Sequence, residues 1–351
     1  MTAEALTRNW YRHDAPPSLL QPLAQLYGWI IQARRESYRR GLLAAQRVGK
    51  PVIVVGNLTV GGTGKTPLVA WLAQQLSARG LKVGLLSRGY GRSAAQPQWV
   101  RVDSDWREVG DEPLLLHQLT GCATLVASDR VAGARALVAH GIDLIVTDDG
   151  LQHLRLARDC EIVVADGARG FGNGRLLPAG PLREPVTRLT SRSILVVNGA
   201  AEHPSLTSLS ALIPQRLSMD LTGSEAHRLD GLEPPRPLAA FRGQRVHAVA
   251  GIGHPERFFR QLQAEGLEIV AHAFADHHPF RAAELEFADE LPVLMTQKDA
   301  VKCRALTAPR LWYVPVVARF AEAQQSALLD LIAERLAPGG LLPPLRASGG
   351  G

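Results

Sequence analysis

The sequence has few cysteines and no long apolar run, and both absences narrow the classes of protein that it can encode. Its three cysteines are scattered over 351 residues without the spacing of a metal site, which argues against a disulfide framework and favours a reducing compartment. No apolar run reaches the ~18–20 residues that a membrane-spanning helix needs. Charges at Glu4, Arg8, Arg12 and Asp14 interrupt the start, which therefore does not read as a signal peptide.

Basic charge is concentrated at one end of the chain. Residues 1–50 hold eight Lys and Arg residues against three Asp and Glu residues, which accounts for most of the net charge of +6. Because the rest is nearly neutral, we expect no nucleic-acid partner. Apolar residues make up 46% of the chain and charged residues 21%, as in an ordinary globular protein, and the length favours two domains.

Apolar runs alternate with helical patterns between residues 51 and 200. Continuous apolar strands separated by helices predict a mainly parallel sheet covered on both faces, as in P-loop NTPases. The predicted strands are 51–56, 82–87, 123–127, 143–147, 161–165 and 193–198, and the predicted helices are 65–79, 112–119 and 129–140.

A second, smaller α/β unit is predicted beyond an irregular stretch rich in Ser, Pro and Leu, and we expect it to hold the phosphate acceptor. Its predicted strands are 246–252, 268–274, 292–296 and 312–316, and its predicted helices are 255–265 and 282–290. We therefore divide the chain into an N-terminal helical segment (1–48), a P-loop core (49–200), a linker (201–240), a smaller α/β domain (241–337) and a disordered tail (338–351).

A glycine loop between the strand 51–56 and the helix 65–79 carries the strongest chemical signal. It closes on Gly-Lys-Thr in the strand–loop–helix context that a P-loop requires, so backbone N–H groups, Lys65 and the helix N-terminus can hold phosphates while Thr66 holds Mg²⁺. One deviation is that Thr59 stands where the motif has its first glycine. The predicted nucleotide-binding residues are Thr59, Val60, Gly61, Gly62, Thr63, Gly64, Lys65 and Thr66.

Two aspartates, Asp148 and Asp149, end the predicted strand 143–147. A carboxylate at this position lies beside the phosphate loop and can bind Mg²⁺ directly or through water, although an Asp-Asp-Gly turn needs no such role. The spacing does not choose between the two aspartates. Gln152 and His153 follow on the same loop and are candidates for contact with phosphate or acceptor.

Arginines near the same sheet edge suit an anionic substrate, because a guanidinium binds phosphate oxygens bidentately. The segment 87–92 supplies Arg88 and Tyr90, and Arg130 and Arg183 are further candidates. Surface loops often contain arginines, so this signal is weak by itself.

Two acidic or histidine-containing segments allow more than one interpretation. Asp111 and Glu112 open a helix, where they either stabilise its N-terminus or take the proton of an attacking hydroxyl. His277 and His278 follow Asp276 and fit a catalytic base, a metal fragment or a polar loop, and the missing third ligand argues against metal.

Residues 17–48 read as a helix whose first half is apolar and aromatic and whose second half is rich in arginine. This composition suits a helix lying in a membrane interface, but it also suits a helix packed on its own domain with a solvated basic face.

Two absent motifs favour an ATP-dependent kinase. Lys298 and Asp299 are adjacent, unlike the Lys and Asp of a guanine-reading N-K-x-D motif, and Val60 stands where partitioning ATPases have an extra lysine. The alternatives are a membrane-associated P-loop ATPase that acts as a switch on a protein partner and a small-metabolite synthetase or kinase.

Five motifs taken together resemble the tetraacyldisaccharide 4′-kinase family of lipid A biosynthesis, and the similarity runs in matching order from about residue 15 to 335. The motifs are the glycine loop 55–67, Ser-Arg-Gly-Tyr-Gly at 87–91, Asp-Asp-Gly-Leu-Gln-His at 148–153, Leu-Pro-Ala-Gly-Pro-Leu-Arg-Glu-Pro at 177–185 and Met-Thr-Gln-Lys-Asp-Ala-Val-Lys at 295–302. Gln297, where the family pattern has Glu, lies outside the expected chemistry.

This resemblance implies an enzyme that transfers the ATP γ-phosphate, with Mg²⁺, to the 4′-hydroxyl of a tetraacylated glucosamine disaccharide 1-phosphate. It also implies two α/β/α domains joined by a hinge, and work at the cytoplasmic face of a Gram-negative inner membrane through the N-terminal segment. No protein partner is required. By resemblance, Asp111 is the catalytic carboxylate, Glu112 lies near the metal and His277 is the partner histidine, with His278 as the less favoured match.

Overall fold

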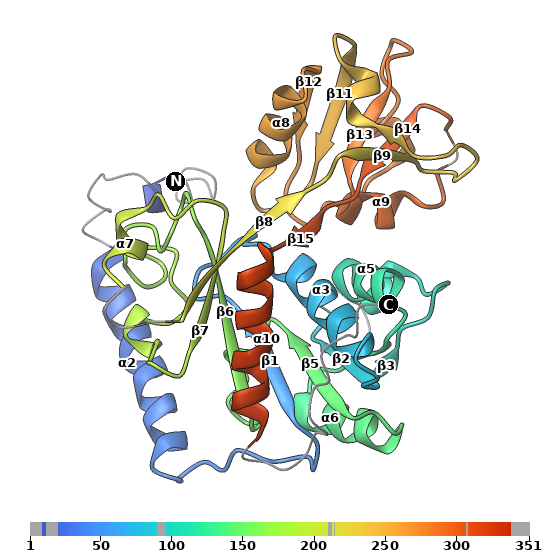
Figure 1. The fold of residues 1–351 in the computed structure, drawn as a ribbon. Coiled ribbons are helices and arrows are strands. Elements are labelled where there is room, and N and C mark those ends of the chain that lie inside the picture. The colour runs from blue at the N-terminus through green and yellow to red at the C-terminus, as the bar shows by residue number, and fades with distance from the viewer. Residues whose placement is uncertain are drawn as a thin grey trace.

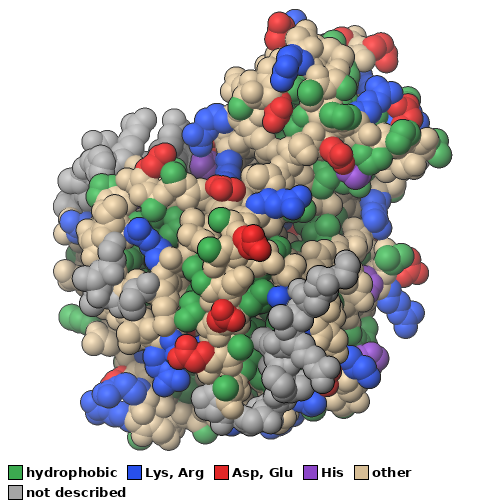
Figure 2. Space-filling model, in the orientation of Figure 1, with side chains coloured by type: hydrophobic (Ala, Val, Ile, Leu, Met, Phe, Trp, Pro, Cys, Tyr) green, Lys and Arg blue, Asp and Glu red, His purple; other side chains and the backbone are tan. Residues whose placement is uncertain are grey.

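The structure is a computed structural model that describes residues 9–11, 20–89, 96–209, 213, 215–306 and 308–337. It contains two sheets, and in Figure 1 the smaller sheet and its helices stand above the larger one. This confirms the predicted α/β class with a P-loop-type parallel sheet and a second α/β unit. Figure 2 shows charged side chains of both signs gathered where the smaller lobe meets the larger one.

The larger sheet has nine strands in the order β15-β8-β7-β6-β1-β5-β2-β4-β3. Its interior pairs are parallel, and only the outermost pairs, β3 with β4 and β15 with β8, are antiparallel. The strands are β1 (Val52–Gly56), β2 (Val83–Ser87), β3 (Gln98–Trp99), β4 (Ala123–Val126), β5 (Leu144–Asp148), β6 (Cys160–Asp166), β7 (Ile194–Asn198), β8 (Arg216–Thr222) and β15 (Val317–Arg319).

Helices cover both faces of the larger sheet, so every residue of its central strands β1, β2 and β5 is buried. In β1, Ile53 and Val55 pack against α3, α5 and α10, whereas Val52 and Val54 point to the opposite face and pack with α6 and α7. The helical elements of this unit are α2 (Leu20–Arg39), α3 (Lys65–Ser77), α4 (Trp106–Val109), α5 (Asp111–Thr120), α6 (Arg130–Ala139), α7 (Pro204–Thr207), α10 (Glu322–Leu336) and the 3₁₀ turn η1 (Val186–Arg188).

The smaller sheet has six strands in the order β10-β9-β14-β13-β11-β12, with a parallel centre from β14 to β12. Helix α8 covers one face and α9 the other. The elements are β9 (Glu225–Arg228), β10 (Arg236–Pro237), η2 (Leu238–Phe241), β11 (Arg245–Ala250), α8 (Pro255–Ala264), β12 (Glu268–Ala273), η3 (Ala282–Glu284), β13 (Val293–Thr296), α9 (Gln297–Cys303) and β14 (Leu311–Val314).

The chain crosses between the two units twice, and the two crossings lie side by side. It leaves the larger sheet after β8 and returns in β15, and these strands pair antiparallel with Val317 opposite Thr222. Gly223, the residue after β8, lies so close to the Pro315 carbonyl that a Cβ atom on it would collide with the carbonyl oxygen. A glycine at this position therefore lets the two crossings run together.

Several sequence expectations differ from the observed elements. The predicted linker 201–240 contains α7, β8, β9 and β10, and β15 and α10 from the predicted smaller domain belong to the larger sheet. The predicted helix 282–290 is wrong, since only the turn η3 forms there. The predicted N-terminal helix 17–48 ends earlier, at Arg39, and Gly41 two residues later adopts a φ of 75°. The predicted disordered tail 338–351 lies outside the described residues.

Candidate functional site

The glycine loop connects β1 to α3 and presents the N-terminus of α3 at the carboxyl edge of the larger sheet. Gly61 and Gly64 both have φ of 94°, a conformation that side chains rarely adopt. A Cβ on Gly64 would lie 2.6 Å from Asn198 Nδ2, and this amide donates to the Thr63 carbonyl at 3.0 Å. The loop is therefore fixed from the end of β7 as well as by its own glycines.

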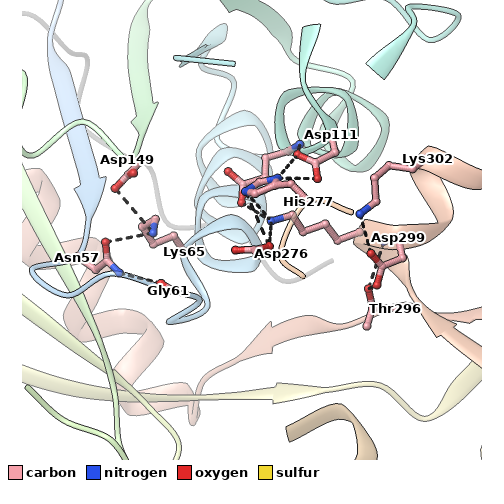
Figure 3. A network of polar contacts seen from close by, with 12 residues as sticks. Asn57, Gly61, Lys65, Asp111, Asp149, Asp276, His277, Thr296, Asp299 and Lys302 are labelled. Carbon is pink, nitrogen blue, oxygen red and sulfur yellow. Dashed lines mark hydrogen bonds and ion pairs between the residues drawn. The ribbon is translucent and has the colours of Figure 1, made fainter. Parts of the chain in front are cut away.

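Lys65, the first residue of α3, lies between an amide and a carboxylate (Figure 3). Its Nζ donates to Asn57 Oδ1 at 3.1 Å and lies 3.7 Å from Asp149 Oδ1, while Asn57 Nδ2 donates to the Gly61 carbonyl at 3.2 Å. These contacts hold the ammonium at the mouth of the loop. The neighbouring Thr66 lies in the first turn of α3, with its side chain part-buried.

Asp148 ends β5 directly beside β1, where it is the Cα partner of Val55. Its side chain is buried, and neither carboxylate oxygen has a hydrogen-bond partner among the described residues. Burial, followed by the charge of Glu112, raises the pKa of Asp148 to about 7. Such a buried, unsatisfied carboxylate is suited to a cation.

Asp149 differs from its neighbour because it is already paired. Arg183 Nη1 donates to Asp149 Oδ2 at 2.8 Å, and the backbone of Asp149 has a φ of 52°. Burial alone would raise the pKa of Asp149, but the charges of Lys65 and Arg183 hold it below its ordinary value. Arg183 is in turn held in place because its backbone N–H donates to the Leu58 carbonyl at 2.7 Å.

Asp111 and His277 meet across the two units. Asp111 opens α5 of the larger unit, and His277 follows β12 of the smaller one; His277 Nδ1 lies 2.9 Å from Asp111 Oδ2 and 3.0 Å from Oδ1 (Figure 3). Burial raises the pKa of Asp111, but the bond from His277 and the charge of Lys298 hold it below its ordinary value. Burial lowers the pKa of His277, but the bond to Asp111 raises it above its ordinary value.

Lys298, the second residue of α9, also joins the two units. Its Nζ donates to Glu112 Oε1 at 2.8 Å and to Asp276 Oδ1 at 3.2 Å, and lies 3.5 Å from His277 Nε2. Burial lowers the pKa of Lys298, but the charges of Glu112 and Asp111 raise it above its ordinary value. Glu112 is therefore engaged by a lysine from the smaller unit.

The remaining candidates surround this centre. Arg130 is buried, and its Nη2 donates to the Asp148 carbonyl at 3.4 Å. Gln152 Nε2 makes a long contact of 3.5 Å with the Asn57 carbonyl. Burial, followed by the charges of Arg130 and Arg88, lowers the pKa of His153 to about 4.

Not every candidate reaches the centre. Arg88 is exposed, and Tyr90 lies outside the described residues. His278 Nε2 lies 3.0 Å from Glu284 Oε1, whereas His277 contacts Asp111.

Three residues at the site were missed by sequence reasoning. Asn57 directly follows a buried strand and Asp276 directly precedes His277, so each had a positional signal. Lys298 was considered as part of a guanine-reading motif and of the family motif at 295–302, but not as a site residue. Its partner Glu112 is 186 positions away, and no sequence pattern reports that contact. No group of three or more His, Cys, Asp or Glu residues that could hold a metal is found in the described part of the chain.

The parallel sheet, the phosphate loop and the acidic strand end beside it define a P-loop nucleotide-binding protein. A family model described as tetraacyldisaccharide-1-P 4′-kinase matches residues 17–336. The tetraacyldisaccharide 4′-kinase of Alkalilimnicola ehrlichii is 52% identical over 313 residues, which are 89% of each chain. That of Stenotrophomonas maltophilia is 48% identical over 337 residues, which are 94% of this chain and 96% of the relative.

A solved structure agrees with these relatives. The crystal structure of LpxK from Aquifex aeolicus in complex with ATP matches with a TM-score of 0.74 and 28% sequence identity, covering 91% of this chain and 98% of that one. The chain therefore belongs to the tetraacyldisaccharide-1-P 4′-kinase family. It is a lipid kinase of lipid A biosynthesis, which confirms the function that the five sequence motifs predict.

Proposed function

We propose that the chain transfers the γ-phosphate of ATP to the 4′-hydroxyl of a tetraacylated glucosamine disaccharide 1-phosphate. The observation that carries this proposal is that the Asp111–His277 pair adjoins the phosphate loop. A Cβ on Gly253 would lie 2.7 Å from the backbone N of Gly62 in the loop and 3.3 Å from Oδ2 of Asp276, the residue before His277. A phosphate on the loop and a hydroxyl at Asp111 would share one site. The ATP in the related Aquifex structure supports the choice of nucleotide.

In this proposal the glycine loop binds the phosphates of ATP. The backbone N–H groups at Gly61, Gly62 and Gly64 face the phosphate oxygens, and the N-terminus of α3 adds partial positive charge. Lys65 leaves Asn57 and Asp149 to contact the terminal phosphates. Its positive charge offsets the negative charge that builds up on the transferred group.

Mg²⁺ fits beside the loop, where it would neutralise charge on the phosphates. Asp148 is the best protein ligand because both of its oxygens are buried and unsatisfied among the described residues, and Thr66 can add a hydroxyl. Asp149 and Glu112 are less free to bind it, since they pair with Arg183 and Lys298. One carboxylate, one hydroxyl, water and phosphate oxygens form a set of ligands that Mg²⁺ accepts.

Asp111 acts as the general base on the acceptor hydroxyl. The His277 Nδ1–H donates to the Asp111 carboxylate, fixing its orientation and stabilising its charge before the reaction. As the 4′-oxygen attacks the γ-phosphorus, its proton moves to Asp111. Arg88 and Arg130 would orient the anionic end of the lipid. Burial and the charges of these two arginines lower the pKa of His153 to about 4, so its ring is neutral.

The direct test is a phosphorylation assay with the purified protein, Mg-ATP and the lipid disaccharide 1-phosphate in detergent. The expected product is a disaccharide bisphosphate. ATP hydrolysis that ignores the lipid would instead support a P-loop ATPase switch. Asp111→Ala should lower kcat by about 10²–10⁴-fold and leave KM for ATP within about twofold, since a general base acts on the chemical step.

The matched control is Glu108→Ala, an exposed carboxylate three positions before Asp111. It should leave both kinetic constants unchanged. Equal losses in kcat and in ATP affinity for Asp111→Ala would contradict its role as a base and indicate a structural one.

Helix α2 supports attachment to the cytoplasmic face of the inner membrane. Leu23, Leu26, Trp29 and Ile30 are 53–69% exposed along one stretch of the helix. The arginines of its second half follow this stretch, an arrangement suited to anionic lipid headgroups. The helices that the structure describes include none with both the length and the apolarity to cross a bilayer.

We expect Trp29→Glu to weaken flotation of the protein with anionic vesicles, because it places a carboxylate where an apolar side chain would enter the interface. The control is Leu232→Glu, which changes a 79% exposed leucine of the smaller unit. Equal flotation of the two variants would argue against α2 as the attachment site.

A further inference from the structure

A fully buried ion pair lies on α9, directly behind the site. Lys302 Nζ is 2.8 Å from Asp299 Oδ1, and both side chains have no exposed surface. A buried pair usually stabilises a fold no better than apolar residues of similar size, because both charges lose their hydration. Its presence on α9 therefore calls for a role other than stability.

The Asp299 carboxylate accepts hydrogen bonds from the end of β13 and from the turn after β11. Its Oδ2 accepts from the Thr296 hydroxyl at 2.6 Å and from the Gly251 N–H at 2.9 Å (Figure 3 shows Thr296, Asp299 and Lys302 together). A Cβ on Gly251 would lie 3.1 Å from Asp299 Oδ1 and 3.2 Å from the Ala275 carbonyl. The turn after β11 thus fits tightly between the carboxylate and the loop after β12.

The same turn holds the backbone of the catalytic histidine. The Gly251 carbonyl accepts from the His277 N–H at 3.2 Å, so one glycine links the buried carboxylate to His277. His277 has a φ of 62°, which is costly for a residue with a side chain and persists only when neighbours hold it. Asp299 provides that hold through Gly251.

Helix α9 is anchored to the larger unit by an apolar contact and a hydrogen bond. Val301 packs in an apolar cluster with Leu115 and Val126 of the larger unit, and Arg304 donates to the Val102 carbonyl at 3.2 Å. Lys302 Nζ lies 5.0 Å from the centre of the Phe280 ring, at the far end of the loop that carries His277. From a helix anchored on the Asp111 side, Lys302 therefore contacts the far end of the His277 loop directly, and Asp299 acts on His277 through Gly251.

We propose that Asp299 and Lys302 are positioning residues that hold the His277 ring against Asp111 through Gly251 and Phe280. The inference rests on the proposed role of His277 in the reaction. Neither residue touches substrate, and each acts through the backbone and packing of residues 274–280. Removing either charge leaves the other buried and unpaired, so the loop rearranges to reach water.

The test is a double-mutant cycle in the full-length enzyme. Lys302→Met and Asp299→Asn should each lower kcat by about tenfold and leave KM for ATP within about twofold. In a His277→Ala background, the same changes should lower kcat by less than about twofold, because the residue that they position is gone. Lys302→Arg, which keeps the charge, should recover part of the loss.

Thermal unfolding separates positioning from stability. Each single variant should lose stability by the same amount with and without His277, whereas the kcat effect should vanish without it. Asp230→Asn, which removes an ion pair with Arg228 elsewhere in the smaller unit, is the matched control and should leave kcat unchanged. If either single variant folds poorly, the double variant Asp299→Asn/Lys302→Met is used, because it leaves no buried charge without a partner. Its effect on kcat is then compared with and without His277 in the same way.

The outcomes separate the inference from the proposal beneath it. Equal kcat losses for Lys302→Met in both backgrounds would overturn the positioning role and leave the role of His277 intact. An unchanged kcat for His277→Ala alone would contradict the proposed reaction role of His277 instead.

Discussion

The two ends of the site are constructed in different ways. At the phosphate end, Lys65 and Asn57 are eight positions apart, and both follow from one strand and its loop in the larger sheet. At the end where we propose that the proton is accepted, Asp111 and His277 are 166 positions apart and come from different units. The side chains that hold Lys65 all belong to the larger unit, although Arg257 of the smaller unit donates to Asn198 beside the loop. The Asp111–His277 pair exists only while the two units are held together.

This difference assigns separate tasks to the two parts of the chain. A parallel sheet fixes the phosphate loop rigidly, since β1 is paired on both sides over its length. The acceptor side relies on side chains from α9 and the β12 loop that reach α5 across the interface. A change at Lys65 should therefore lower kcat/KM for ATP without altering the contact between the two units. Changes at the interface residues should alter that contact.

At the phosphate end, the largest effect is expected for Lys65→Ala. Loss of the ammonium removes the charge nearest the transferred phosphate, so kcat/KM for ATP should fall by about 10²–10³-fold. Because Lys65 contacts only the larger unit among the described contacts, thermal stability should change little. Steady-state kinetics and thermal unfolding measure the two quantities.

Lys50→Ala is the control, since Lys50 Nζ lies 3.6 Å from Oδ1 of Asp143, directly before β5 and at the opposite end of that strand from Asp148. It should retain full activity. A large loss of thermal stability in Lys65→Ala would show that Lys65 supports the fold as well as the binding of phosphate.

A smaller effect is expected for Lys298→Met. This change removes the ammonium that joins Glu112 to Asp276 and leaves two carboxylates near each other without a counter-ion. We expect kcat to fall by about tenfold, with faster hydrogen exchange in residues 274–280. In Lys65→Ala the exchange of that segment should stay as in the unchanged protein. Similar exchange in both variants would remove the distinction between the two ends.

The phosphate end was largely predictable from sequence, because local signals determine it. A buried strand, glycines and Gly-Lys-Thr lie within one short stretch, and Asp148 ends the strand that pairs with it. The contacts of Lys298 could not be predicted, since they depend on how two sheets approach. The resemblance supplied Asp111 and His277, but no spacing reported that they meet.

The wrong helix at 282–290 shows how tertiary contacts override local preference. The segment is rich in Ala, Glu and Leu, which favour helix. Instead, Arg310 Nη2 donates to the Leu285 carbonyl at 3.2 Å, and Arg310 Nη1 donates to the Phe287 and Asp289 carbonyls. Asp289 also binds His247 at 2.9 Å. Carbonyl groups that a helix would use internally are bound by a distant arginine.

The smallest effect concerns pH and isolates the proton-accepting end. The pKa of Asp111 is lowered from 3.8, so its pairing stabilises the fold above that value and is lost as pH falls through the folded pKa. The pKa of His277 is raised from 6.5, so its charge stabilises the fold below 6.5 and is lost as pH rises through the folded pKa. The stabilisation from both charges is therefore complete only between these two ordinary values.

Asp111→Asn should consequently cost more stability at pH 5.5 than at pH 8.5, by on the order of 1 kcal/mol in the free energy of unfolding. Asp129→Asn, at the N-terminus of α6 in the larger unit, is the comparison. The pKa of Asp129 is lowered from 3.8 and its charged partner is Arg155, so its carboxylate is charged at both pH values and its penalty should not change between them. Denaturant unfolding at the two pH values measures both variants. Of these two carboxylates, only Asp111 has a partner that titrates in this range. A pH-independent penalty for Asp111→Asn would therefore mean that His277 is not charged in the folded protein and that a neutral imidazole donates to the Asp111 carboxylate.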